Sequence, residues 1–573
     1  MNNLRVTRLS GSIATSAGLL LVLACSQSPD VQWADTVYHG GTIVTVNDSQ
    51  PLAEALAVRA GRIVSVGDRA EVFALVGEGT THVDLKGRTL LPGFVDGHCH
   101  FAGFGAQAIG ANLLAMPDGT VGDIEQLIAA LRVFAEGPDV ARTGWIFGMG
   151  YDDAVLAEGR HPTRDELDRV STEFPVMAVH ISGHFTVVNS VGLREIGYSA
   201  DSEDPVGGVI RRREGSREPN GVLEELASIP HTMKLLAPKS EADQFYYLKR
   251  GEDLAKSFGY TTAQEGRALA SNHDILANYA QKQGFDIDVV SYVEYTEREP
   301  LDSEWYGREY RNRYRVAGLK LTLDGSPQGR TAWRTVPYLL PPHGQEAGYL
   351  GYPAVPDDQV VVDFIEEAYQ QNWQVLVHAN GDAAIDQFIA AVESAEGLHE
   401  PMDRRHVLIH GQFVRQDQLD SLAELSIVPS LFPMHTFYWG DWYDKIIGPE
   451  LAQQISPMRS ALDRGMLVTS HTDAPVARPN LLRVMSATVN RTSRSGKVMG
   501  PDERITPLEA LKGITIWGAY LHFEEDNKGS LEVGKLADLV IVSENPLTVE
   551  HHAIGEIQVL ETIKEGRTIY RAE

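Results

Sequence analysis

The chain has 573 residues, of which 50 are Lys or Arg and 78 are Asp or Glu, so its formal net charge at pH 7 is −28. This acidity argues against nucleic acid or an anionic lipid surface as the main partner, because both attract basic patches. Hydrophobic residues make up 43% and charged residues 22%, which excludes wholesale disorder. Two cysteines, Cys25 and Cys99, are too few for a disulfide scaffold or an all-cysteine zinc site.

The N-terminus has the pattern of a bacterial export signal. Two arginines precede an apolar run at residues 13–24, which is too short to span a membrane. The run ends in Val-Leu-Ala before Cys25, which resembles a lipobox. We therefore expect cleavage after residue 24, a lipid on Cys25, and a polar tether over 25–34. The protein would be exported and membrane-anchored, facing the periplasm from the outer membrane in a Gram-negative cell; an ordinary secretory signal is the alternative.

Both ends of the remaining chain have a sequence pattern typical of short β-strands. Residues 35–91 alternate β-branched residues with glycine-containing turns, and residues 521–573 return to this pattern. We expect the two segments to build one small, composite β-sandwich.

Residues 92–520 alternate short apolar runs with helical patterns. Eight β-then-α units favour a distorted TIM (β/α)8 barrel, an α/β fold whose active site lies at the carboxyl ends of the strands. The interval between the first two strands is too long for one connection, so residues 101–257 are expected to be a large insertion, a lid or side wall. The predicted strands are 94–100, 259–265, 287–294, 318–323, 374–378, 406–410, 427–431 and 467–473, with helices at 357–371 and 383–395.

Histidines and an aspartate end several of these strands. His98 and His100 are two residues apart, so they share one strand face while Cys99 points away. A single such histidine is more often a hydrogen-bonded core residue. Five metal-competent side chains at four strand ends are hard to explain by packing, because buried polar groups are costly unless paired. The pattern indicates a divalent metal site, completed by His378, His410 and Asp473.

Lys320 lies within a predicted buried strand, where a lysine needs a partner. One interpretation is a salt bridge to Asp324 or Glu265. The other is carboxylation of the amine by CO2, which gives a carboxylate able to bridge two metal ions. The sequence leaves both interpretations open.

Residues 91–100, LPGFVDGHCH, resemble the first-strand signature of the amidohydrolase superfamily, and residues 35–570 resemble its YtcJ-like branch, amidohydrolase family 3. Two departures are His471, in a Ser-His-Thr-Asp stretch where Gly-Ser-Asp is common, and Glu265, where aspartate is usual. Further matching stretches are KLTLDGSPQGRTA (320–332), HANGDAAID (378–386), RHVLIHGQ (405–412) and GSLEVGKLADLVI (529–541). The resemblance implies a metal-dependent hydrolase with one or two divalent ions, zinc expected and manganese or iron as alternatives. The implied ligands are His98, His100, His378, His410 and Asp473, with N6-carboxylated Lys320 as the bridge.

The resemblance also implies a reaction. We expect hydrolysis of a carbon–nitrogen, non-peptide amide bond by a metal-activated hydroxide, with Asp473 as general base and then general acid. His410 or His184 is expected to stabilise the oxyanion. A deaminase or a cyclic amide or ester hydrolase on the same site is the first alternative. The second is a non-catalytic surface lipoprotein that retains the scaffold.

Candidate substrate-binding residues lie in the insertion and after the seventh strand. His180 and His184 flank a Ser-Gly pair, and His435 precedes a run of aromatic residues. With Trp145 and Tyr151 they are predicted to contact substrate, although each residue could equally pack in a core. We expect a small amide with an apolar or aromatic N-substituent and no nucleic acid; a homodimer is compatible with the sequence.

Overall fold

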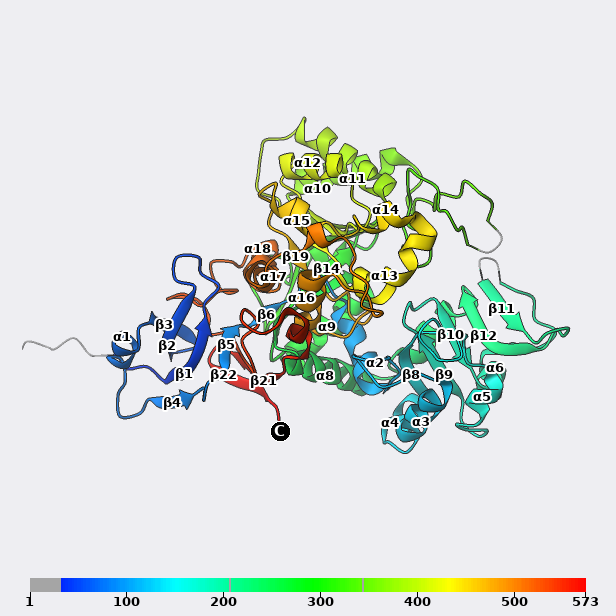
Figure 1. The fold of residues 1–573 in the computed structure, drawn as a ribbon, viewed down its shortest axis with the longest axis horizontal. Helices are drawn as coiled ribbons and strands as arrows, with labels where there is room; N and C mark the ends of the chain where they lie inside the picture. Colours follow the sequence, from blue (N-terminus) through cyan, green and yellow to red (C-terminus); the bar gives the residue numbers. More distant parts are fainter. Residues whose placement is uncertain (1–31, 206–207, 343–344) are drawn as a thin grey trace, which may run out of the picture.

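The computed structural model describes residues 32–205, 208–342 and 345–573, which form three sheets with helices between them (Figure 1). The predicted signal peptide, Cys25 and most of the tether lie outside the described residues, so the lipid anchor stays a prediction. Within the part of the chain that is described, no helix is long and apolar enough to cross a membrane.

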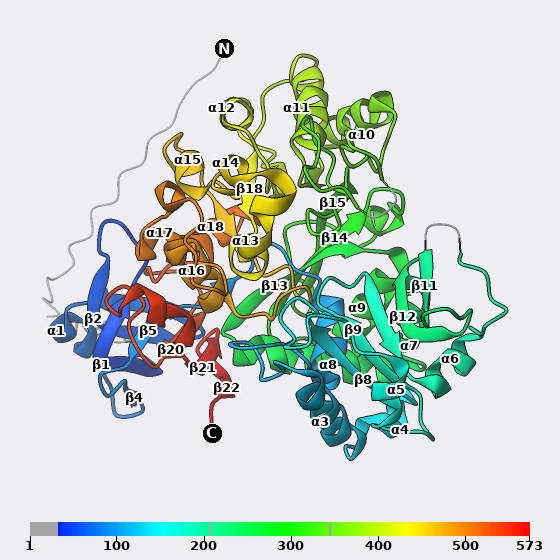
Figure 2. The same ribbon diagram turned by 45° about the vertical axis from the view of Figure 1, so that its right-hand side comes forward.

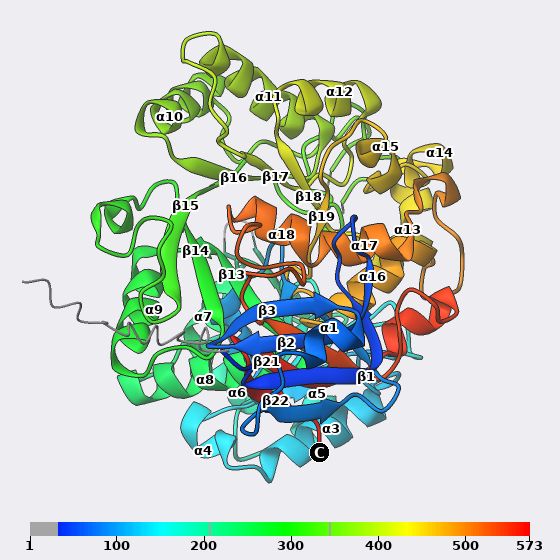
Figure 3. The same cartoon turned by 90° about the vertical axis from the view of Figure 1, so that its left-hand side faces the viewer.

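Strands from both ends of the chain share one eight-stranded sheet, seen in blue and red in Figure 3. β5 (Thr89–Pro92) pairs antiparallel with β20 (Leu539–Val542), which joins the two ends by backbone hydrogen bonds. β1 (Thr36–Val44) passes from β4 (Thr81–Asp84) to β5 at a bulge. The bonding is therefore continuous where two sandwich sheets are predicted. The other strands are β2 (Leu52–Arg59), β3 (Arg62–Gly67), β21 (Val559–Lys564) and β22 (Arg567–Arg571).

The central sheet is a distorted TIM barrel of eight parallel strands in the order β6, then β13 to β19. Each predicted strand has a counterpart, but the first and last are short, β6 (Phe94–Val95) and β19 (Thr469–Ser470). The two edges meet through Asp96, whose carboxylate accepts a hydrogen bond from the Thr472 hydroxyl at 2.6 Å. The remaining strands are β13 (Tyr260–Ala268), β14 (Asp288–Glu294), β15 (Tyr314–Thr322), β16 (Gln374–Ala379), β17 (Val407–His410) and β18 (Val428–Leu431).

Helices cover the outside of this sheet (Figures 1 and 3). α10 (Asp358–Gln371) shows why: its apolar side chains recur at helical spacing, Asp357 caps its N-terminus, and Asn372 ends it in the left-handed conformation. The other helices of the barrel region are α8 (Glu241–Ser257), α9 (Ala270–Lys282), α11 (Asp382–Glu396), α12 (Gln416–Glu424), α13 (Met434–Ile447), α14 (Pro449–Ala452), α15 (Met458–Leu462), α16 (Leu481–Asn490), α17 (Pro507–Gly513) and α18 (Ile516–Leu521).

The long insertion has a sheet of its own beside the barrel, cyan to teal in Figure 2. Leu114 and Ile181 of the insertion pack against aromatic residues of α13, so its loops reach the carboxyl ends of the barrel strands. Its strands are β7 (Ala111–Asn112), β8 (Ile146–Tyr151), β9 (Val176–His180), β10 (Phe185–Val188), β11 (Gly208–Arg212) and β12 (Pro219–Glu225), and its helices include α2 (Phe104–Ile109), α3 (Ile124–Ala135), α4 (Asp139–Thr143), α5 (Arg164–Asp168), α6 (Ser190–Ile196) and α7 (Ile229–Leu236).

A buried ion cluster fastens the barrel to the terminal sheet. Asp288, at the start of β14, binds the ammonium groups of Lys528 and, at 2.6 Å, Lys564 of β21. Lys564 also contacts Asp538 at 2.7 Å. Burial raises the pKa of the Asp288 carboxyl, but the two lysines outweigh burial and hold its pKa below the ordinary value.

We expect Asp288→Ala to lower the free energy of unfolding by about 3–5 kcal/mol at pH 7, because two buried ammonium groups each lose a carboxylate partner and keep only Asp538, for Lys564, and Glu524, for Lys528. A carboxyl with a depressed folded pKa stabilises the fold above its unfolded pKa of about 3.9, and this contribution disappears at lower pH. The difference between wild type and variant should therefore narrow as the pH falls from about 5 to 3. Urea unfolding of wild type and variant at pH 5 and at pH 3 measures this difference in the free energy of unfolding. Asp526→Ala, at an exposed position, is the control, and an equal effect of both variants would contradict the prediction.

Candidate active site

His98 and His100 follow the first barrel strand and lie side by side. The strand ends at Val95, earlier than predicted, yet the two imidazole centroids are 5.0 Å apart. Cys99 turns the other way, with its Sγ 3.0 Å from the carbonyl oxygen of Gln264. Burial raises the pKa of the Cys99 thiol well above its ordinary value, so this cysteine is a neutral packed group outside the pair.

Asp473 faces both histidines from the other edge of the barrel. Its Oδ1 lies 3.4 Å from His100 Nε2 and 3.7 Å from His98 Nε2. This oxygen is buried and has no hydrogen-bond partner among the described residues. A buried carboxylate oxygen without a donor is costly unless something else binds it.

His378 and His410 complete the group at the ends of the neighbouring strands β16 and β17. Their ring centroids are 4.5 Å apart, and His410 is 5.6 Å from His98. Burial, reinforced by the Lys320 ammonium, lowers the pKa of His378 to about 3. Burial and His378 hold the pKa of His410 well below its ordinary value. Both imidazoles are therefore neutral at pH 7, which is the form that binds a metal ion.

Two residues of the group hold strained backbone conformations. His410 has a φ of 72° and Asp473 a φ of 52°, in the left-handed region that non-glycine residues rarely adopt. Such strain costs about 1–3 kcal/mol per residue and persists mainly at functional sites.

Lys320 reaches the group from β15. It is 2% exposed, and its Nζ lies 3.1 Å from His98 Nε2. Burial lowers the pKa of the Lys320 ammonium to about 7. The salt bridges considered from the sequence do not form: no carboxylate of the described chain lies within 4.0 Å of Nζ. Asp324 instead accepts three backbone N–H groups, and Glu265 accepts the Ala102 N–H.

Comparison with known proteins agrees with this geometry. The amidohydrolase family model matches residues 81–570. The chain belongs to the amidohydrolase family. It is 29% identical over 561 residues to protein LONG AFTER FAR-RED 3 of Arabidopsis thaliana, covering 94% of this chain and 92% of that protein. It is 25% identical over 552 residues to the N-substituted formamide deformylase of Arthrobacter pascens, covering 93% of this chain and 98% of that enzyme.

A solved structure shares the fold of this amidohydrolase over nearly its whole length. A metal-dependent hydrolase from Pyrococcus horikoshii superposes with a TM-score of 0.70 and 24% identity, covering 90% of this chain and 99% of that chain. This likeness shows the fold, and membership of the amidohydrolase family makes the protein a hydrolase of that family. Its donor set fits a divalent ion, because imidazoles and a carboxylate are side chains that bind zinc and Asp473 Oδ1 has no hydrogen-bond partner among the described residues.

Two residues that the sequence did not single out as functional orient this group. Gln264 Oε1 lies 2.6 Å from His98 Nδ1, so that nitrogen carries the proton and Nε2 faces Asp473. Asp96 accepts hydrogen bonds from Thr472 and, at 2.6 Å, from the Tyr260 hydroxyl. Burial raises the pKa of Asp96 to about 6. The buried acid in the first-strand motif was the signal that could have drawn attention to Asp96.

His471 also enters the amidohydrolase site. Sequence comparison marks it only as a departure, but its ring lies 5.1 Å from His410 and 5.3 Å from His98. His410, His471 and Asp473 form a second group with donor atoms within 4.8 Å of one another, beside the group of His98, His100 and Asp473.

The histidines predicted in the insertion hydrogen-bond to residues of the insertion itself. His184 Nδ1 is 2.8 Å from Glu225 Oε2, and all its hydrogen bonds in the described chain stay within the insertion. A catalytic role for His184 stays a prediction. His180 Nε2 lies 3.1 Å from Asp153. Asp152 beside it binds Arg494 of the barrel at 3.0 Å, so the charges of this third metal-competent group are already met within the protein.

Two predicted pocket aromatics are core residues instead. Trp145 packs among apolar side chains beneath the insertion sheet, and Tyr151 is fully buried with its hydroxyl 2.9 Å from His161 Nδ1. Both depart from the predicted contact with substrate, because the insertion is large enough to have a core of its own. His435 lies closer to the site: its ring packs 4.7 Å from Phe432, which also stacks on His471.

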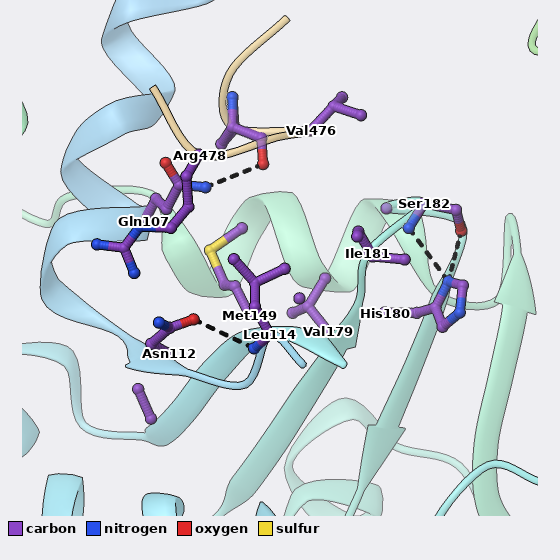
Figure 4. Close-up of a pocket in the computed structure, with 14 residues that line it drawn as sticks. Gln107, Asn112, Leu114, Met149, Val179, His180, Ile181, Ser182, Val476 and Arg478 are labelled. Carbon is purple, nitrogen blue, oxygen red and sulfur yellow. Dashed lines mark hydrogen bonds between the residues drawn. The ribbon is translucent and has the colours of Figure 1, made fainter. Parts of the chain in front are cut away.

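A cavity of about 100 Å³ lies between the insertion and the chain that follows Asp473 (Figure 4). Leu114, Met149, Val179 and Ile181 line it from the insertion, and Pro475 and Val476 line it from the chain after Asp473. His180 lines it as well, hydrogen-bonded to Ser182 at 2.8 Å. Its lining includes Pro475, two residues after Asp473, but none of the histidines of the cluster.

Proposed function

We propose that the protein hydrolyses a non-peptide amide bond, cleaving carbon–nitrogen with a divalent metal ion as cofactor. The observation that carries this proposal is the meeting of His98, His100, His378 and His410 around Asp473 at the carboxyl ends of the barrel strands. Burying imidazoles and a carboxylate oxygen without a partner among the described residues is costly, so packing alone does not account for them. Together they are a set of side chains that binds a metal ion.

The ion would be held by these five side chains, with zinc as the expected metal and Lys320, if carboxylated, as a further ligand. When bound, a divalent ion supplies an acidified water and polarises the substrate carbonyl. Gln264 and Asp96 keep the ligands in place, the first by fixing the tautomer of His98 and the second by tying β6 to the segment of Asp473.

Asp473 would move the proton. Its Oδ1 lies near His98 and His100 and accepts no hydrogen bond from the described residues, while the Asp473 backbone N–H donates to the His98 carbonyl at 3.1 Å. It can take a proton from the attacking water and return it to the leaving nitrogen, so that a carboxylate and an amine are released. His410, with a ring nitrogen within 4.8 Å of an Asp473 oxygen, would stabilise the oxyanion.

The substrate we propose is a small amide with an apolar or aromatic substituent on nitrogen. The apolar cavity next to Pro475 supports such a substituent, with His180 at its wall and His435 near the site. The similarity to an enzyme named N-substituted formamide deformylase supports the same bond type.

The test is a hydrolysis screen of the zinc-loaded and the manganese-loaded protein with N-formyl, N-acyl and cyclic amides, with amine release as the readout. We expect turnover of at least one N-substituted amide, loss of turnover after chelation, and recovery on adding metal. Turnover confined to aminopurines or esters would replace the amide proposal by the deaminase or esterase alternative. A protein that binds no divalent ion would contradict the proposed metal dependence.

A further inference from the structure

We infer that His471 is a direct ligand of the bound divalent ion, in a second corner of the site formed with His410 and Asp473. This inference rests on the proposed function, because it concerns the same metal site. It adds a ligand that the family resemblance does not supply, since the stretch around His471 departs from the family pattern.

His471 has no other visible purpose for its two nitrogens. The side chain is 0% exposed, and neither Nδ1 nor Nε2 makes a well-aligned hydrogen bond in the described residues, although the backbone of His98 lies close enough to interact with the ring. A buried imidazole must carry one N–H donor and one acceptor, and leaving both unpaired costs about 1–3 kcal/mol for each group. An apolar residue would fill the same space without this cost, so packing alone does not explain a histidine here.

The surroundings hold the ring toward the other metal-competent groups. Phe432 stacks on His471 with centroids 5.3 Å apart and an interplanar angle of 24°. On its other sides lie the rings of His410, at 5.1 Å, and His98, at 5.3 Å. Donor atoms of His471, His410 and Asp473 lie within 4.8 Å of one another, which allows one ion to contact all three.

The second corner shares Asp473 with the first. His98, His100 and Asp473 form one three-donor group, and His410, His471 and Asp473 form the other. The Asp473 carboxylate thus lies between two sets of imidazoles, and its Oδ1 is buried without a hydrogen-bond partner among the described residues. With His471 as a ligand, the second corner has three protein donors before any contribution from Lys320.

The experiment measures zinc binding to the intact protein by competition with a chromophoric chelator, together with thermal unfolding with and without zinc. His471→Phe should weaken zinc binding at the second corner by about 100-fold or more, beyond the loss typical of a residue that only orients a ligand. The metal-free variant should unfold at or above the wild-type temperature, because it loses two unpaired polar atoms, whereas its stabilisation by zinc should be smaller.

His406→Phe is the matched control. His406 is also fully enclosed and has an unpartnered Nε2, but it lies just before β17, at the opposite end of the strand from His410. It should leave zinc affinity unchanged. Equal zinc affinity of His471→Phe and wild type would overturn the inference while the proposed function stands. Failure of the wild type to bind zinc, manganese or cobalt would overturn both.

A direct measurement on the wild type covers the case in which the variant does not fold. Anomalous scattering from a zinc-loaded crystal locates each ion. A ring nitrogen of His471 at about 2.0–2.1 Å from an ion supports the inference, and a separation beyond about 3 Å from every ion overturns it.

Discussion

Asp473→Asn is expected to lower kcat/KM for the amide substrate by about 1,000-fold while the protein keeps its fold and most of its metal. Asparagine preserves the size of the side chain and its Oδ1, which faces His98 and His100, but it cannot accept and return a proton at neutral pH. General acid–base catalysis by one positioned group contributes about 10²–10⁴-fold, which sets this magnitude.

The measurement is steady-state kinetics with matched metal analysis. Asp382→Asn provides the control, because Asp382 is another buried carboxylate, at the start of α11, and lies outside the cluster. That variant should retain turnover even if it is less stable. If Asp473→Asn lost its metal in proportion to its activity, Asp473 would be needed as a ligand and its role as proton carrier would lack support. Turnover near the wild-type level would remove Asp473 from the chemistry altogether.

The barrel itself could be predicted because its strands are buried on both faces. Parallel strands of this kind read as continuous apolar runs, and the eight runs in the sequence correspond in order to β6 and β13–β19. The points at which the first and last barrel strands end were less predictable. β6 stops at Val95 and β19 at Ser470, because the chain leaves the ladder there to turn His98, His100 and Asp473 toward the centre.

The ligand candidates could be predicted from position at strand ends, but their supporting contacts could not. Gln264 and Asp96 act through partners far away in sequence, and no local pattern tells which glutamine or aspartate meets a particular histidine. His471 was visible in the sequence only as a departure from a motif. That its ring nitrogens have no well-aligned hydrogen bond among the described residues is visible only in three dimensions.

The insertion was the hardest part to interpret. Aromatic residues near a predicted mouth favour a binding role, yet Trp145 and Tyr151 are needed for the core of a sheet whose existence the sequence did not reveal. His184 similarly hydrogen-bonds to Glu225, on a strand of that same sheet. Once an insertion folds around its own core, its histidines and aromatics have partners inside it, and proximity to the barrel site must be established residue by residue.

Lys320→Ala is expected to reduce the bound metal from about two ions per chain to one or fewer, since a carboxylated lysine would supply the bridge between two ions. The structure favours this chemistry over an ion pair, because Nζ touches His98 and no carboxylate of the described chain lies within ion-pair distance. The lowered pKa of Lys320, about 7, leaves much of the amine neutral at pH 7, and the neutral amine is the form that adds CO2.

Three measurements separate this role from a purely structural one. Metal analysis gives the stoichiometry, and Lys445→Ala, at an exposed position on α13, should leave it unchanged. Wild type loaded with ¹³C-bicarbonate should show a carbamate carbon signal that Lys320→Ala lacks. Acetate or propionate, which can occupy the space of the lost carboxylate, should restore metal binding to the variant. Two ions bound to Lys320→Ala without added acid would exclude Lys320 as a ligand. The role of the buried amine would then be limited to its contact with His98.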